Sequence, residues 1–324
     1  MTDTTWKAEA DAGDWGERAR TVAVELAASA AERAASARLP HREVTLLKDS
    51  GLITLLGPAE HGGGAQEWPV ADRVVRIVSA ADPALGELLG RHYVWVRLAS
   101  FIATREKTEH IDEVSARARW LFGGALDVRG AALTVRDRGD DIVFNGRITP
   151  STAARVSDIT LLEGRFPDGS PVSSLAMSTH VGLTFDDDDS GTVTVRDADI
   201  PWSGALGYVG KVFQPRAYND LLVPTLHLVL AQAALGAAAG RLAAGGHPHS
   251  GRTELGAALR AAEDEADAVS EEAGALHRRA AALTASETAA HADRTARLLA
   301  RARAAAAAVT GQNAASVPQQ DGVR

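Results

Sequence analysis

The chain has 324 residues, of which 45% are hydrophobic and 23% are charged, as is usual for a folded globular protein. Its net charge of −8 argues against a nucleic-acid partner, because phosphate binding needs clustered Lys and Arg. The absence of cysteine excludes disulfides, thiolate nucleophiles and Cys-ligated metal sites, and it favours a cytoplasmic location.

The N-terminal third is predicted to be helical. Residues 1–10 are polar and contain no apolar signal core, so we do not expect secretion. Gly51 stands where a left-handed cap would end a helix, and Pro69 lies near a helix start, where its missing N–H costs nothing. Apolar spacing predicts helices over 15–37, 41–50, 68–81 and 83–104, with a loop over 58–65.

The middle third shows the period of two that is typical of strands. Apolar residues alternate on either side of the turn 139–141, at Leu133 and Val135 before it and at Ile142 and Phe144 after it, which predicts a hairpin. Further strands are predicted at 158–163, 172–178, 181–185 and 192–198. These short strands indicate a small antiparallel β domain inserted in a mainly α protein.

Beyond Pro215 the pattern is helical again. We interpret the apolar run 221–244 as a helix buried within a bundle rather than a membrane span, because it carries Pro224 and several polar residues. A 4-3 spacing of Leu and Ala from Leu255 to Leu283, repeated from Leu298, predicts an antiparallel helical hairpin. The same seam would serve either for self-association or for packing within one chain.

These patterns divide the chain into a helical domain (1–118), a β domain (119–212), a helical bundle (213–313) and a disordered tail (314–324).

Three stretches carry motifs that occur together in one enzyme family. The first runs from Gly51-Leu52 to Gly64 and on to Ala80-Ala81-Asp82-Pro83 and His92-Tyr93-Val94-Trp95. The second contains Gly123-Gly124-Ala125-Leu126-Asp127, Asn145-Gly146-Arg147, Ser151-Thr152-Ala153 and Ser157-Asp158. The third joins Ser190-Gly191-Thr192-Val193 to Asp199-Ile200-Pro201. In this order they resemble the acyl-CoA dehydrogenase family, in particular its flavin-dependent monooxygenase branch, typified by dibenzothiophene monooxygenase.

The resemblance implies an N-terminal helical domain, a middle β domain and a C-terminal helical bundle, with FMN or FAD as cofactor. A flavin needs hydroxyl and backbone donors at its ring and phosphate. By family position Asp127, Ser151, Thr152, Ser190 and Gly191 would bind it. Asp127 replaces the neutral Asn that is usual there, and a carboxylate repels an electron-rich reduced ring. For Ser151 and Thr152 the alternative is a turn cap.

His92 is the candidate catalytic residue, because the pKa of a free histidine lies near neutrality and oxygenation needs a group that handles a proton. The alternative is a hydrogen-bonded core histidine. Tyr93 and Trp95 are candidate walls of the substrate pocket, or else packing residues. No metal site is expected at His61 or at His247 and His249, which lack a third ligand.

The leading hypothesis is a flavin-dependent oxidoreductase that receives reduced flavin from a separate reductase and oxygenates a small apolar or aromatic substrate. Acyl-CoA dehydrogenase activity is disfavoured, because 221–244 contains no Asp or Glu to abstract an α-proton. The second hypothesis is a flavin-free relative that uses the cavity for cyclisation or elimination, or only for binding. The carboxylates at 186–189 and the absence of the family's last segment favour this second hypothesis.

The expected partners are the substrate and a flavin reductase. A homo-oligomer (dimer or tetramer) is expected, or a hetero-oligomer with a related chain that completes the site. Neither nucleic acid nor a membrane is expected as a partner.

Overall fold

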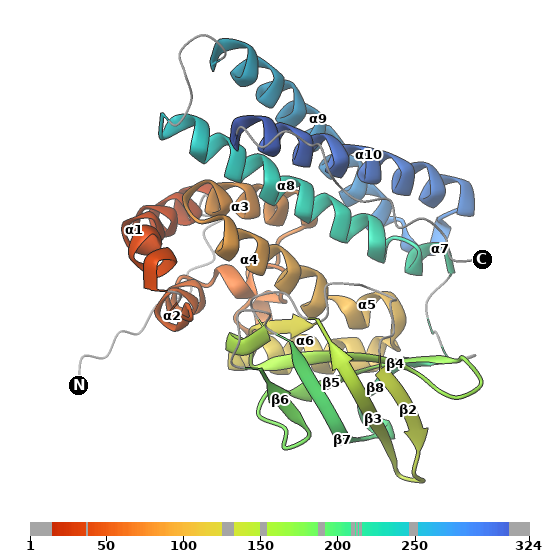
Figure 1. The fold of residues 1–324 in the computed structure, drawn as a ribbon. Coiled ribbons are helices and arrows are strands. Elements are labelled where there is room, and N and C mark those ends of the chain that lie inside the picture. Colours follow the sequence, from red (N-terminus) through yellow and green to blue (C-terminus); the bar gives the residue numbers. More distant parts are fainter. Residues whose placement is uncertain are drawn as a thin grey trace, which may run out of the picture.

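The computed structural model describes residues 15–36, 38–124, 133–149, 154–186, 192–208, 211, 213, 216–245 and 252–310. Figure 1 shows the sheet on one side of the molecule and a layer of long helices on the other, with α3 and α4 between them. The predicted tail 314–324 lies outside the described residues, as do the carboxylates 187–189.

The N-terminal helices follow most of the predicted ranges. They are α1 (Trp15–Ser36), α2 (His41–Asp49), α3 (Trp68–Ala81), α4 (Pro83–Val96), α5 (Leu98–Ile102) and α6 (Arg105–Ala118). The single helix predicted over 83–104 is wrong, because the backbone leaves helical geometry at Arg97 (φ −93°, ψ 1°). The helix α6 was not predicted. Its buried side chains are only Ile111, Ser115 and Ala116, so the sequence shows no clear apolar period there.

The strands form one mixed sheet. They are β1 (Phe122–Gly124), β2 (Leu133–Asp137), β3 (Asp141–Ile148), β4 (Ile159–Arg165), β5 (Pro171–Met177), β6 (Leu183–Phe185), β7 (Val193–Pro201) and β8 (Ala205–Tyr208). The predicted hairpin is confirmed, with Val135 of β2 opposite Phe144 of β3. Most pairs are antiparallel, but β1 and β2 pair with β4 in parallel, because β3 and the segment after it form a crossover connection.

The C-terminal region consists of α7 (Arg216–Asn219), α8 (Leu222–Ala243), α9 (Arg252–Arg278) and α10 (Ala285–Thr310). The segment Arg216–Ala243 is long and apolar enough to cross a membrane, but 72% of its most apolar window is buried inside the protein, as in a core helix. The predicted seam packs within the chain, since Leu259 and Val269 of α9 share a buried cluster with Leu298 of α10 and Leu228 of α8.

Helix α8 belongs to two cores. Its side towards α9 and α10 forms the bundle core, and its other side packs with α3 and α4 in the largest core, which also contains Phe122 of β1. A separate core that contains Phe144 lies within the sheet. Because the largest core joins the N-terminal helices to α8, the predicted domain boundaries stay a prediction.

Two glycines let α8 approach α3 closely. A Cβ atom added to Gly236 would lie 2.2 Å from the carbonyl oxygen of Arg76, and one added to Gly240 would lie 1.9 Å from that of Ala80. Carbon and oxygen atoms that are not bonded stay well beyond these distances, so only glycine allows this approach.

We expect Gly240→Ala to lower the free energy of unfolding by about 1–3 kcal/mol, the usual cost of overpacking, although Ala is the better helix former. Gly256→Ala is the matched control, because its Cβ would meet Arg260 Nη1 at 3.4 Å and Leu242 Cδ2 at 3.7 Å, which are ordinary contacts. Urea unfolding followed by circular dichroism measures both variants. Equal midpoints would show that the close approach of α8 to α3 does not depend on the missing side chain of Gly240.

Candidate functional site

The candidate site lies where α4 meets the 3-10 turn η1 (Leu52–Thr54) and the start of β1. Helix α4 begins at Pro83, preceded by Asp82, whose side chain accepts a hydrogen bond from the backbone N of Leu85 at 3.0 Å. This cap fixes the start of the helix that carries His92, Tyr93 and Trp95.

The side chain of His92 is fully buried, and backbone atoms engage both ring nitrogens. Its Nε2 lies 2.7 Å from the carbonyl oxygen of Ile53, and the backbone N of Phe122 donates to its Nδ1 at 3.0 Å. A ring nitrogen that accepts a hydrogen bond carries no proton, so the ring is neutral with its hydrogen on Nε2. The imidazole therefore joins η1 to β1.

Burial keeps this imidazole neutral. Loss of solvation lowers the pKa of His92 to about 4, and the hydrogen bond to Ile53 and the charge of Asp158 act in the opposite direction without cancelling this effect. These contacts are those of a positioning residue. The proton-transfer role of His92 stays a prediction.

The neighbouring aromatic residues are also buried. The hydroxyl of Tyr93 donates to the carbonyl oxygen of Leu52 at 2.7 Å, and burial raises the pKa of this phenol well above its usual value. The indole of Trp95 is 1% exposed and lies against Gly124, the last residue of β1. Tyr93 therefore anchors η1, while Trp95 lies next to the end of β1. Their roles in substrate binding stay predictions.

A charged contact connects α2 to the same corner. Lys48 Nζ lies 2.6 Å from Asp158 Oδ2, which also accepts a hydrogen bond from the backbone N of Leu121 at 2.7 Å. Sequence reasoning included Asp158 in a motif but missed Lys48, because the two residues are 110 positions apart and no local pattern joins them.

The glycine-rich loop supports η1. The carbonyl oxygen of Thr54 accepts hydrogen bonds from the backbone N of Gly57 and of Gly64, both at 2.9 Å. A Cβ atom on Gly63 would lie 2.3 Å from the carbonyl carbon of Gly57. These glycines thus allow two backbone segments to touch, which fixes the turn that presents the Ile53 carbonyl.

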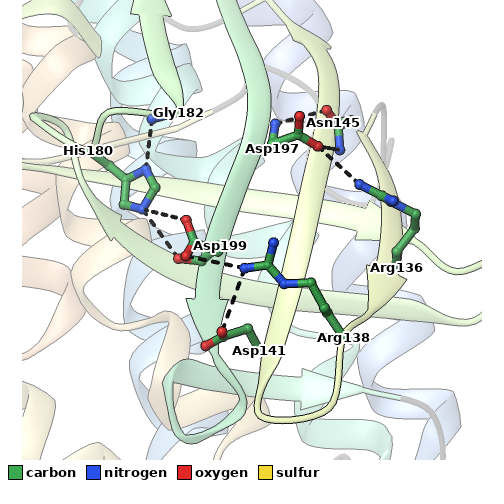
Figure 2. A network of polar contacts seen from close by, with 8 residues as sticks. All are labelled: Arg136, Arg138, Asp141, Asn145, His180, Gly182, Asp197 and Asp199. Carbon is green, nitrogen blue, oxygen red and sulfur yellow. Dashed lines mark hydrogen bonds and ion pairs between the residues drawn. The ribbon is translucent and has the colours of Figure 1, made fainter.

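The Asn145-Gly146 motif shapes the outer face of the sheet. Figure 2 shows the Asn145 amide bound to Asp197 on β7: Nδ2 donates to Asp197 Oδ1 at 3.2 Å, and the backbone N of Asp197 donates to Oδ1 of Asn145 at 2.9 Å. The pairing register shifts at this point, and Asp197 has a left-handed φ of 43°. Arg136 binds the same carboxylate at 3.0 Å. The motif therefore stabilises a β-bulge among exposed ion pairs.

The five residues predicted to bind flavin lie outside the described residues: Asp127, Ser151, Thr152, Ser190 and Gly191. His247 and His249 lie outside them as well. Within the described ranges no group of three or more His, Cys, Asp or Glu residues could hold a metal ion.

Comparisons with known proteins give relatives of one kind. No family model matches the chain. A dibenzothiophene monooxygenase of Rhodococcus qingshengii is 30% identical over 249 residues, which are 69% of this chain and 59% of that protein. A Pseudomonas putida protein named as a probable FMNH2-dependent monooxygenase is 26% identical over 222 residues, or 64% of this chain and 56% of that protein. The chain thus spans less than two thirds of the length of these relatives.

Solved structures share the fold. Dibenzothiophene monooxygenase from Paenibacillus sp. A11-2 superposes with a TM-score of 0.83 at 23% identity, covering 92% of this chain and 84% of that one. Methanesulfinate monooxygenase from Pseudomonas fluorescens superposes with a TM-score of 0.83 at 21% identity, covering 91% and 84%. The likeness in fold therefore extends over about nine tenths of the chain.

The order of helices, sheet and helical bundle is that of the acyl-CoA dehydrogenase fold, and the chain belongs to this family, in its flavin-dependent monooxygenase branch. Within the branch its sequence is similar to the dibenzothiophene monooxygenases.

We expect His92→Gln to lower the free energy of unfolding at pH 7 by about 1–3 kcal/mol, because two backbone groups lose a well-placed partner. The folded-state pKa of His92, about 4, lies below the ordinary 6.5, so the unfolded chain takes up the proton first as the pH falls. The stabilisation by His92 is complete above pH 6.5 and is lost towards pH 4, with about 2 kcal/mol lost between pH 7 and pH 5.

The difference in the free energy of unfolding between the unaltered protein and His92→Gln should therefore be smaller at pH 5 than at pH 7. Urea unfolding at both pH values measures it. His110→Gln is the control, because it makes the same replacement at an exposed position. A difference between the unaltered protein and His92→Gln that stays constant from pH 7 to pH 5 would mean that folding does not lower the pKa of His92.

Proposed function

We propose that this chain is a flavin-dependent monooxygenase that oxygenates a small apolar or aromatic substrate with FMN or FAD and O2. The sequence similarity to dibenzothiophene monooxygenase over 69% of the chain carries this proposal. The relative from Paenibacillus sp. A11-2 has a structure with FMN and indole, and this supports a planar aromatic substrate. A bound reduced flavin would supply the electrons that activate O2.

The described residues at the end of β1 fit a planar, electron-rich ring. Gly124 has no side chain, and Trp95 and Leu161 beside it are apolar and buried. His92 is neutral, and the carboxylate of Asp158 is balanced by Lys48. A reduced flavin is destabilised by uncompensated negative charge, so this neutral corner suits it.

The strand register supports the proposed flavin residues. Ile148 at the end of β3 pairs with Val193 at the start of β7. In the sequence Ser151 and Thr152 follow Ile148 by three and four positions, and Ser190 and Gly191 precede Val193 by three and two. We assign these four residues and Asp127 to flavin binding. Tyr93 and Trp95 are assigned to the substrate side and His92 to the support of this corner.

A flavin reductase is the proposed partner, because reduced flavin must be supplied from outside the chain. The cytoplasm is the proposed location. We also propose that the chain assembles, either with itself into a dimer or tetramer or with a related chain. The mass of the protein in solution, with and without a co-expressed relative, distinguishes these two assemblies.

Titration of the purified full chain with FMN and FAD, each oxidised and reduced, tests the proposal. We expect saturable binding of at least one reduced flavin, and oxygenated product when an aromatic thioether and O2 are added. Replacing Ser151 and Thr152 with Ala should weaken flavin binding about tenfold, as loss of one or two hydrogen bonds does. Thr134→Ala, an exposed hydroxyl on β2, is the control. Absence of saturable binding would favour the flavin-free alternative, with non-redox chemistry or binding alone.

We expect Asp127→Asn to tighten the binding of reduced flavin more than that of oxidised flavin. Removing a carboxylate from the side of an electron-rich ring gains about 1 kcal/mol at close range in a solvated site, or about fivefold in affinity. Asp140→Asn, in the hairpin turn of the sheet, should change neither constant. Equal effects on the binding of both redox forms would show that Asp127 does not lie beside the flavin ring.

A further inference from the structure

One face of α4 carries an unusual set of polar side chains. Glu87, Arg91 and Trp95 are four residues apart, so they lie one above the other along the helix. Arg91 is 6% exposed and Trp95 is 1% exposed, whereas the side chain of Glu87 is 47% exposed. The set therefore leads from solvent into the interior.

Two hydrogen-bond donors on this face have no acceptor within the described part of the chain. The Nε and Nη2 atoms of Arg91 each lie 2.9 Å from Glu87 Oε1, which leaves Nη1. Both Arg91 Nη1 and Trp95 Nε1 are buried, and neither has a hydrogen-bond partner among the residues that the structure describes. A buried donor without a partner costs about 1–3 kcal/mol, and native structures keep few of them. The two donors belong to residues one helical turn apart on the same face of α4.

The position of these donors points to the proposed active site. A Cβ atom on Gly124 would come within 3.4 Å of Trp95 Nε1, so the N–H end of the indole lies beside the end of β1. At Gly90 the helix instead faces Val75 of α3 and Val229 of α8. Around the helix, Arg91 lies about 40° from Trp95 and about 100° from Gly90. The two residues therefore lie on the flank of α4 towards β1, with the Arg91 guanidinium held against Glu87 one turn earlier.

We propose that Arg91 and Trp95 bind a hydrogen-bond acceptor of the substrate, and that this acceptor is uncharged, such as a carbonyl oxygen, a sulfoxide oxygen or a ring nitrogen. Glu87 already balances the charge of Arg91, so an anion at this place would leave an excess buried negative charge. The inference rests on the proposed function and narrows the substrate from aromatic compounds in general to those that carry such an acceptor.

Calorimetric titration of the full chain with three bicyclic probes tests this inference: naphthalene has no acceptor, quinoline has a neutral ring nitrogen, and 2-naphthoate is an anion. We expect quinoline to bind about tenfold more tightly than naphthalene and also more tightly than 2-naphthoate, since one well-placed hydrogen bond in a buried site contributes about that factor. The measurement needs no flavin and no turnover.

Trp95→Phe keeps the ring and removes the N–H, and Arg91→Met keeps the length of the side chain and removes the charge. In either variant the ratio of the affinity for quinoline to the affinity for naphthalene should fall towards one. Arg76→Met is the matched control, because Arg76 is a mostly buried arginine whose ion pair with Asp267 lies between α3 and α9. It should leave the ratio unchanged.

Any of three results would overturn the inference. These are an affinity ratio near one in the unaltered protein, no binding of quinoline, and an affinity ratio that neither substitution lowers. Flavin titration of the same variants separates this result from the proposed function. Flavin binding with no discrimination between the probes would reject only the acceptor site. Discrimination that depends on Trp95 and Arg91 without flavin binding would keep the site and reject the monooxygenase.

Discussion

The neutral imidazole of His92 is the contact on which the candidate site depends. It joins the carbonyl of Ile53 to the N–H of Phe122, and these two residues are 69 positions apart as numbered in the chain. Protonation would remove the acceptor that Phe122 needs, so this bridge exists only because burial excludes water and disfavours the charge. One desolvated ring thereby fixes the start of β1 relative to the helices. In the sequence, Asp127 follows the last residue of that strand by three positions.

The remaining contacts of the corner follow from the same constraint. A site that keeps a histidine neutral is poor in solvent, and a lone carboxylate there would be costly. Asp158 is therefore found with Lys48 and with a backbone donor at Leu121. The close approach of Gly63 to Gly57 stabilises the turn that presents the Ile53 carbonyl, since no side chain separates the two backbones. Apolar packing, a balanced charge and close backbone contact thus act together at one place, and a planar cofactor would benefit from each of them.

The sequence predicts what local patterns encode. The range of α3 follows from Trp68-Pro69 and the apolar spacing after them, and the β2–β3 hairpin follows from the turn around Gly139. It does not predict the break at Arg97, whose side chain binds Asp112 on another helix at 2.6 Å, nor β1, which is too short to show a period of two. His92 was found from its residue type and family position. Its partners are backbone atoms from distant segments, and no side-chain pattern marks them.

The ion pair of Arg91 with Glu87 is not explained by stability. The buried guanidinium must offset its desolvation against a carboxylate that is 47% exposed, and apolar side chains of similar size stabilise a core as well or better. Arg76 has a tertiary reason for its charge, since it connects α3 to Asp267 on α9. Arg91 and Glu87 lie one turn apart on the same helix, so their contact fixes no element relative to another. What the pair does achieve is to hold a guanidinium inside the protein with Nη1 unpaired among the described residues, one helical turn from Trp95, whose indole N–H is in the same state. Such an arrangement lowers the stability of the empty protein and gains free energy only when an acceptor enters, which is the expected property of a binding site.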